Sequence, residues 1–218
     1  MKNFAPLLFL LGGFAAFAQE PTVSAQQTYT EGVHYNLIEP AYETSEAEQV
    51  IVYEFFSYKC PHCSSFQPHI KPWHNKLPQH IKLVRVPVVF QESWKVFAKA
   101  YYTAETMGII EKTHQPFFNA IHKQLKRLNT IEDVATWFAE NFQVDREEFL
   151  STANSFMIDS KVRQSQNLTR KMQISSTPTV IVNGKFKPNT KKLPTLASLL
   201  DMSLYLANQE AARMGLNK

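Results

Sequence analysis

The chain has 218 residues and two cysteines, Cys60 and Cys63, which are separated only by Pro61 and His62. Two cysteines placed at random would lie three positions apart on the order of 1% of the time, so the spacing is informative. A disulfide between them closes a loop too small to stabilise the fold much, because stabilisation grows with loop length. We therefore expect a redox-active Cys60–Cys63 disulfide rather than a structural one.

A zinc site is the main alternative for these cysteines. Structural zinc takes four nitrogen or sulfur ligands, so two histidines would have to complete the set. Neither His74 nor His80 shows the paired spacing of such ligands, and no cofactor-binding motif is present. We expect neither a metal nor a cofactor.

The two cysteines lie where a strand is expected to meet a helix. Residues 49–58 are β-branched and aromatic, which is typical of a strand buried on both faces. The residues that follow predict a helix over 61–76, because apolar side chains recur there at helical spacing. They are Phe66, Ile70, Trp73 and Leu77.

The start of that helix gives the cysteines different chemistry. Pro61 suits the first helical position and Cys60 the N-cap. An N-cap sulfur faces the unpaired N–H groups and the positive end of the helix dipole, which favour a thiolate. His62 adds a further donor or positive charge. Cys63, one turn inside, should be more buried and less acidic.

Two segments resemble one known family. Glu54-Phe-Phe-Ser-Tyr-Lys-Cys-Pro-His-Cys63 resembles the active-site segment of the DsbA family of the thioredoxin superfamily, in the tetrad and in the acid six residues before Cys60. The block from Ser176 to Phe186 is similar to that family's cis-proline strand and hairpin. The resemblance implies an α/β, thioredoxin-like fold with an inserted all-helical domain.

This organisation divides the chain into three parts. Residues 1–18 predict a signal peptide cleaved after Ala18, from a basic Lys2, a short apolar stretch and a small-x-small site; a retained membrane anchor is the alternative. Residues 19–91 and 161–218 form the discontinuous thioredoxin-like domain, and 92–160 the helical insert.

Local patterns predict the remaining elements. Strands are expected at 35–38, 81–89, 179–183 and 185–187, with a hairpin turn at Asn183-Gly184. Capping boxes at Thr130/Asp133 and Asp145/Glu148 should open two helices in the insert. Apolar residues that recur at helical spacing from Phe117 to Leu128 predict another helix there. A polar segment over 160–173 returns to the sheet, and a last helix begins near Pro194.

Glu54 interrupts the apolar strand, where an unpartnered carboxylate is costly to bury. One interpretation is an edge position that reaches water. The other is a buried acid with a raised pKa that moves a proton to or from Cys63. The family resemblance implies Arg85 as its basic partner, and Lys82 is close enough in sequence to be the alternative.

Pro178 is implied to be cis by the resemblance alone. Its role would be to present the backbone of Thr177 to a substrate peptide, which adds as a short strand beside Cys60. Thr177 departs from the valine of the best-known members and resembles isomerase-like relatives.

Composition narrows the function. An apolar content of 44% argues against disorder, and a net charge of +4 without a basic cluster does not indicate nucleic-acid binding. The resemblance implies a periplasmic thiol oxidase that introduces disulfides into exported proteins and is re-oxidised by a DsbB-like quinone-linked membrane protein. A monomer is the default expectation for the oligomeric state. The alternatives are an isomerase or reductase of the same superfamily and a non-enzymatic, peptide-binding chaperone.

Overall fold

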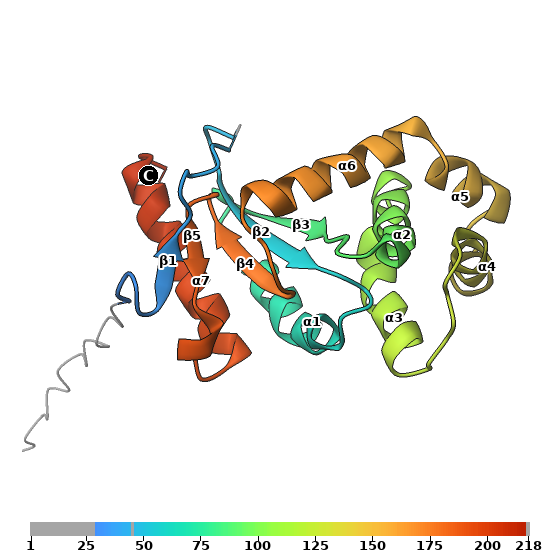
Figure 1. The fold of residues 1–218 in the computed structure, drawn as a ribbon, viewed down its shortest axis with the longest axis horizontal. Coiled ribbons are helices and arrows are strands. Elements are labelled where there is room, and N and C mark those ends of the chain that lie inside the picture. The colour runs from blue at the N-terminus through green and yellow to red at the C-terminus, as the bar shows by residue number, and fades with distance from the viewer. Residues whose placement is uncertain (1–28, 45, 217–218) are drawn as a thin grey trace, which may run out of the picture.

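Five strands form one mixed sheet in the order β1-β5-β4-β2-β3 (Figure 1). The computed structural model describes residues 29–44 and 46–216. The expected signal peptide, residues 1–18, lies outside the described residues. Strand β2 pairs in parallel with β3 and antiparallel with β4, and β1 lies antiparallel to β5. The strands are β1 (Tyr35–Leu37), β2 (Val50–Phe56), β3 (Ile81–Pro87), β4 (Thr179–Val182) and β5 (Phe186–Pro188).

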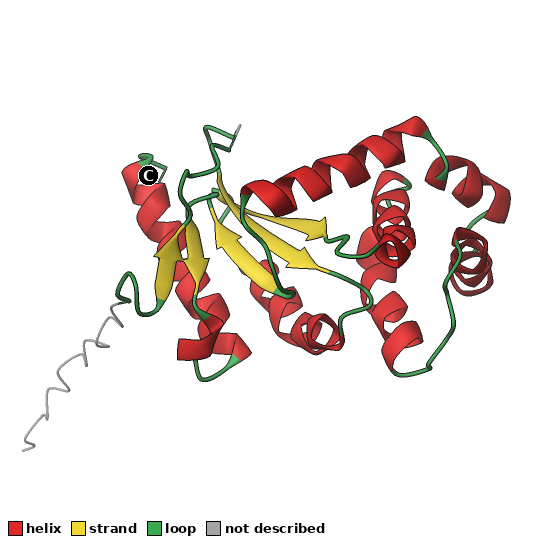
Figure 2. Cartoon of the chain, viewed as in Figure 1, coloured by secondary structure: helices red, strands yellow, loops and turns green. Residues whose placement is uncertain are grey.

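Helices cover both faces of the sheet and gather beyond its β3 edge (Figure 2). They are α1 (Pro61–His74), α2 (Lys95–Thr106), α3 (Ile110–His122), α4 (Ile131–Phe142), α5 (Arg146–Ala153), α6 (Phe156–Lys171) and α7 (Leu196–Arg213), with short 3-10 turns η1 (Glu92–Trp94) and η2 (Thr190–Lys192). In the part of the chain that is described, no helix combines the length and apolarity needed to cross a membrane.

Every residue of β2 is buried, which explains its nearly continuous apolar sequence. Side chains alternate between the faces of a strand, so Val50 and Val52 pack with α1 and α7 while Ile51 and Tyr53 pack on the opposite face. Glu54 lies at a central position of this strand and not at a sheet edge. The edge interpretation of Glu54 is therefore wrong.

The helical insert has an aromatic core that continues into the end of β2. Phe117, Phe138 and Phe149 are fully buried in it, and the same cluster contains Cys60 and Cys63. The capping box at Thr130 and Asp133 is present, and Asp145 caps α5 by accepting from the Glu148 N–H. The insert therefore packs directly against the residues expected to do chemistry.

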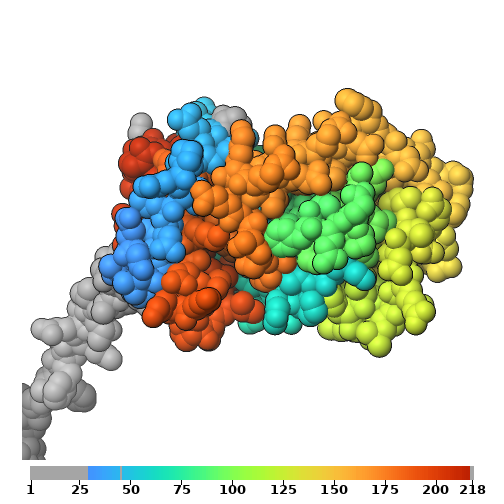
Figure 3. All heavy atoms as spheres, in the orientation of Figure 1, coloured from blue at the N-terminus to red at the C-terminus, as the bar shows by residue number. Residues whose placement is uncertain are grey.

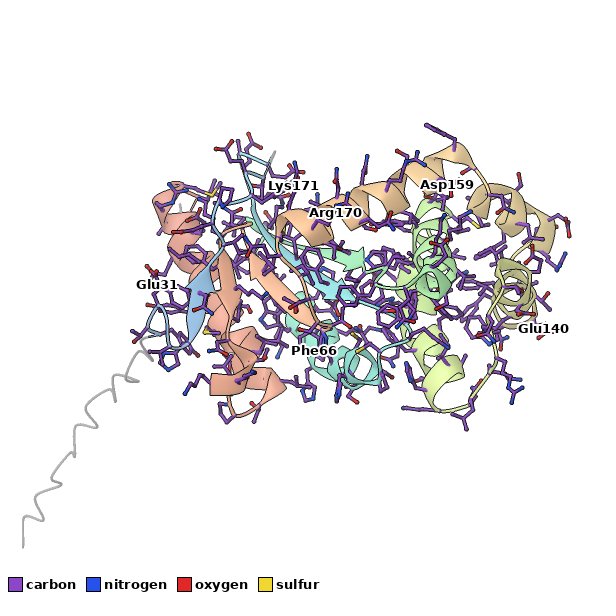
Figure 4. The ribbon with its side chains drawn as sticks, viewed as in Figure 1. Glu31, Phe66, Glu140, Asp159, Arg170 and Lys171 are labelled. Carbon is purple, nitrogen blue, oxygen red and sulfur yellow. The ribbon has the colours of Figure 1, made fainter. Side chains whose placement is uncertain are left out.

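The polar segment over 160–173 is mostly helix, because α6 continues to Lys171. Its buried face is narrow and includes Ser165 and Thr169, whose hydroxyls donate to carbonyls of their own helix. These small polar residues hide the helical periodicity in the sequence. Asp159 ties α6 to Lys99 of α2 at 3.1 Å (Figure 4). The helix extends along the surface from the sheet region to the insert (Figure 3) and through the expected boundary at residue 160.

Other boundaries differ by a few residues. Helix α3 ends at His122, so Leu125 lies outside it and is exposed instead of continuing the stripe from Phe117. The last helix begins at Leu196 after its N-cap, Thr195, whose hydroxyl accepts from the Ser198 N–H.

Candidate active site

Cys60 is the N-cap of α1, and its sulfur faces the first turn of the helix. Its Sγ accepts from the backbone N–H of Cys63 at 3.4 Å, and Pro61 occupies the first helical position. Both cysteines are free thiols in this structure. Cys60 keeps 8% of its surface exposed, whereas Cys63 is completely buried. Of the two cysteines, Cys60 is therefore the one that retains some exposed surface.

The two thiols have opposite acidities. Hydrogen bonds with the side chain of Cys63, with Thr177 and with the backbone N–H groups of Cys63 and His62 lower the pKa of Cys60 to about 5, against the effect of burial. Burial, together with the neighbouring Cys60 sulfur, raises the pKa of Cys63 above its ordinary value. Cys60 is thus a thiolate at neutral pH and Cys63 a protonated thiol, as expected from their positions.

The loop before β4 faces the sulfur of Cys60. The Thr177–Pro178 peptide bond is cis, as the family resemblance implied. Sγ of Cys60 lies 3.3 Å from the backbone carbonyl oxygen of Thr177, to which the protonated form of the thiol donates. Phe66 (Figure 4), one turn after Cys63, shares a core cluster with Val180 and so packs α1 against β4, the strand that follows this loop.

Glu54 is buried and bound on two sides. Its Oε2 lies 3.3 Å from Nε of Arg85, and its Oε1 accepts from the Gln67 side chain at 2.9 Å. Burial raises the pKa of Glu54, while Arg85 and Gln67 oppose the rise. Lys82 is not the partner, because the strand register pairs Glu54 with Arg85 and Lys82 instead meets Glu46 at 3.7 Å.

His62 contributes through its main chain in this structure. Its imidazole is exposed and forms none of the hydrogen bonds or ion pairs found among the described residues, whereas its backbone N–H lowers the pKa of Cys60. Among the described residues, no group of three or more His, Cys, Asp or Glu side chains could hold a metal ion.

Sequence reasoning missed three polar residues around this site. Gln67 lies one helical turn after Cys63, a spacing that could have identified it. His114 and His122 of α3 bind Tyr58, two residues before Cys60, at 2.6 and 2.7 Å. Since both histidines are distant from Tyr58 in sequence, no local pattern connects them to the cysteines.

Comparisons with known proteins agree with this architecture. The profile of a thioredoxin family matches residues 41–202. The thiol:disulfide interchange protein DsbA of Pseudomonas aeruginosa is 36% identical over 184 residues, which cover 84% of this chain and 87% of that protein. DsbA of Burkholderia cepacia is 35% identical over 205 residues, covering 92% and 95%. The crystal structure of P. aeruginosa DsbA matches with a TM-score of 0.80 at 36% identity, over 85% of this chain and 96% of that chain. The chain therefore belongs to the DsbA family of thiol:disulfide oxidoreductases and has their thioredoxin-like fold.

Proposed function

We propose that this protein is a periplasmic thiol oxidase that introduces disulfides into exported proteins through Cys60 and Cys63. The observation that carries the proposal is the contrast between Cys60, which keeps 8% of its surface exposed and whose pKa is lowered to about 5, and the completely buried Cys63, whose pKa is raised. A stabilised Cys60 thiolate favours the dithiol form of the enzyme, and so makes the disulfide form a strong oxidant.

The reaction consists of two exchanges. A substrate thiolate attacks Sγ of Cys60 in the disulfide form, which breaks the Cys60–Cys63 bond and forms a mixed disulfide with Cys60. The sulfur of Cys63 leaves with the electron pair and takes up a proton, for which Glu54 is the proposed source. A second substrate thiolate then attacks the substrate sulfur of the mixed disulfide and releases Cys60 as a thiolate. The substrate loses two electrons and the enzyme gains them.

Substrate binding is proposed at Thr177 and Pro178. An extended peptide pairs there with the backbone of Thr177 as a short added strand and brings its thiol to Cys60. His62 is proposed to add a donor or positive charge beside the thiolate. Re-oxidation of the dithiol requires an oxidant, which we propose to be a DsbB-like quinone-linked membrane protein. The signal peptide predicted over residues 1–18 is the basis for the proposed periplasmic location, and we propose that the mature protein is a monomer.

The equilibrium of the Cys60–Cys63 pair with glutathione tests this function. A pair that is reduced even by weakly reducing glutathione mixtures is the result expected of a dithiol oxidase. A pair that stays oxidised until conditions are strongly reducing would contradict it. Thr177 resembles isomerase-like relatives, so a pair that resists reduction would make an isomerase or reductase the better assignment.

A chaperone-like function is tested separately with Cys60→Ser. The oxidase mechanism requires this variant to lose all activity in forming substrate disulfides. Full biological activity of Cys60→Ser would instead assign the surface beside Pro178 to peptide binding without redox chemistry.

A further inference from the structure

Tyr58 is held at two points by a helix of the insert. Its hydroxyl shares a 2.6 Å hydrogen bond with Nδ1 of His114, and its backbone carbonyl accepts from Nε2 of His122 at 2.7 Å. Both histidines belong to α3, eight residues apart, so they lie on one face of that helix. One helix therefore fixes both the side chain and the main chain of a single residue.

The surroundings make this attachment rigid. Tyr58 is buried, and its ring contacts Phe117 and Phe118 of α3 with centroids 4.6 and 4.7 Å away. Phe118 lies between the two histidines in sequence and contacts both rings. Burial lowers the pKa of His114, which keeps its imidazole neutral and suited to share a hydrogen bond with a hydroxyl.

Tyr58 belongs to the turn that delivers Cys60 to the start of α1. The N–H of Cys60 donates to the carbonyl of Ser57 at 3.0 Å, and the N–H of Lys59 donates to the Ser57 hydroxyl at 3.2 Å. The direction of the Cys60 side chain toward Thr177 depends on this turn. Fixing Tyr58 therefore fixes the position of the reactive sulfur.

We infer that His114 and His122 are positioning residues for the redox pair, which they hold through Tyr58. This inference rests on the proposed roles of Cys60 and Cys63. In the oxidised protein the covalent bond to Cys63 itself restrains Cys60, whereas in the reduced protein only non-covalent contacts do. Loss of the α3 anchor therefore harms the reduced form more than the oxidised form and makes the pair a weaker oxidant.

Two substitutions at one position test this in the full-length mature protein. His122→Phe removes the donor but keeps a flat ring against Phe118, and His122→Gln keeps an N–H donor. In the glutathione equilibrium we expect His122→Phe to favour the oxidised protein by about fivefold, the loss typical of one hydrogen bond. We expect His122→Gln to stay within about twofold of the unmodified protein. Tyr58→Phe, which loses only the hydroxyl contact, should shift the equilibrium in the same direction by about threefold.

Thermal unfolding of both redox forms separates positioning from general stability. A purely structural role lowers the unfolding temperatures of the reduced and oxidised forms equally. The positioning role lowers that of the reduced form more, so the gap between the two forms narrows. His34→Phe is the matched control, because His34 is also half-buried and its ring accepts a hydrogen bond from the backbone N–H of Thr30. His34 directly precedes β1, the outer strand at the opposite edge of the sheet from β3 (Figure 1). It should leave the glutathione equilibrium unchanged.

An unchanged equilibrium and an unchanged gap in His122→Phe would overturn the inference. If His122→Phe does not fold, the same comparison in Tyr58→Phe decides. Failure of the proposed oxidase function is recognised independently, because it appears in the unmodified protein as a pair that resists reduction, whatever the variants do.

Discussion

Glu54 and Arg85 face each other across the parallel pair β2 and β3, with Oε2 of the acid 3.3 Å from Nε of the base. Arg85 also reaches Oε1 of Glu111, which is exposed, at 3.4 Å. Arg85 therefore links the buried carboxylate of Glu54 to the exposed carboxylate of Glu111. The two carboxylates share a partner but differ in burial, which allows their roles to be separated by substitution.

Glu54→Gln should slow thiol exchange by about ten- to a hundredfold, because an amide cannot give or take the proton of Cys63. Burial raises the pKa of Glu54, so ionised Glu54 lowers the stability of the fold at pH values above the ordinary pKa of a glutamate. The neutral amide introduced by Glu54→Gln carries no such penalty, and the substitution should therefore not lower the unfolding temperature. Rapid-mixing kinetics with a reduced peptide, together with thermal unfolding, measures both. Glu111→Gln is the matched control and should exchange at the normal rate. Loss of folding in Glu54→Gln, with normal exchange in the folded fraction, would indicate a structural role.

The ultraviolet absorbance of the thiolate should titrate with a midpoint of about pH 5 in the reduced protein. Cys60→Ser should show no such step, since Cys63 remains protonated. A midpoint near the ordinary value of 9.0 would contradict the stabilisation of Cys60 at the helix N-terminus.

The same shift makes the stability of the reduced protein depend on pH. The pKa of Cys60 is lower in the folded than in the unfolded chain, so its stabilising contribution is complete above about pH 9 and is lost as the pH falls to about 5. The oxidised protein has no such thiolate. Urea unfolding should show that the reduced form becomes more stable relative to the oxidised form as the pH rises from about 5 to about 9. A difference in unfolding free energy between the two forms that stays constant with pH would refute the prediction.

Glu210 of α7 is a buried carboxylate that binds the β4–β5 hairpin. It accepts from Lys185 and Arg213, and from the Asn183 side chain at 2.8 Å. The Arg213 hydrogen bond, with those of Lys185 and Asn183, lowers the pKa of Glu210 to about 2. The stabilisation of the fold by ionised Glu210 is therefore complete at pH values above the ordinary pKa of a glutamate and is lost as the pH falls toward 2.

Glu210→Gln should lower the free energy of unfolding at neutral pH by about 1–3 kcal/mol, because two cations lose their counter-charge. Under strongly acidic conditions the variant and the unmodified protein should converge. Glu147→Gln removes the exposed pair with Arg146 and should cost less than about 1 kcal/mol. Equal losses of unfolding free energy in the two variants, measured by urea unfolding, would show that the buried Glu210 cluster stabilises the fold no more than an exposed ion pair does.

Gly184 lies at the hairpin turn with φ +67, and a Cβ there would collide with the backbone carbonyl of Tyr42. Gly184→Ala should therefore destabilise the protein by about 3 kcal/mol or more. Gly108 has nearly the same φ, +68, but open space around it, so Gly108→Ala should cost only the backbone term of about 1 kcal/mol. Similar losses of unfolding free energy would show that the Tyr42 contact is unimportant.

Local patterns predicted the elements around the cysteines well, because each depends on neighbouring residues. The N-cap at Cys60, Pro61 at the first helical position and the buried β2 strand all follow from short stretches of sequence. The capping box at Thr130 is equally local.

Features that depend on register or on distant packing were not predictable in this way. Arg85 and Lys82 are three apart on a strand and so point to opposite faces, but only the pairing with β2 decides which faces Glu54. The second half of α6 was obscured because Ser165 and Thr169 replace apolar residues on its buried face. The α3 histidines meet Tyr58 only through the tertiary fold.

The contact between Cys60 and Thr177 joins residues that are 117 positions apart. A chain synthesised from its N-terminus exposes both cysteines before the segment with Thr177 exists. During that interval Thr177 cannot contribute to lowering the pKa of Cys60, and only the partners close to Cys60 in sequence are present. The full set of contacts that stabilises the Cys60 thiolate is therefore complete only after the segment that contains Thr177 has been synthesised and has folded against α1.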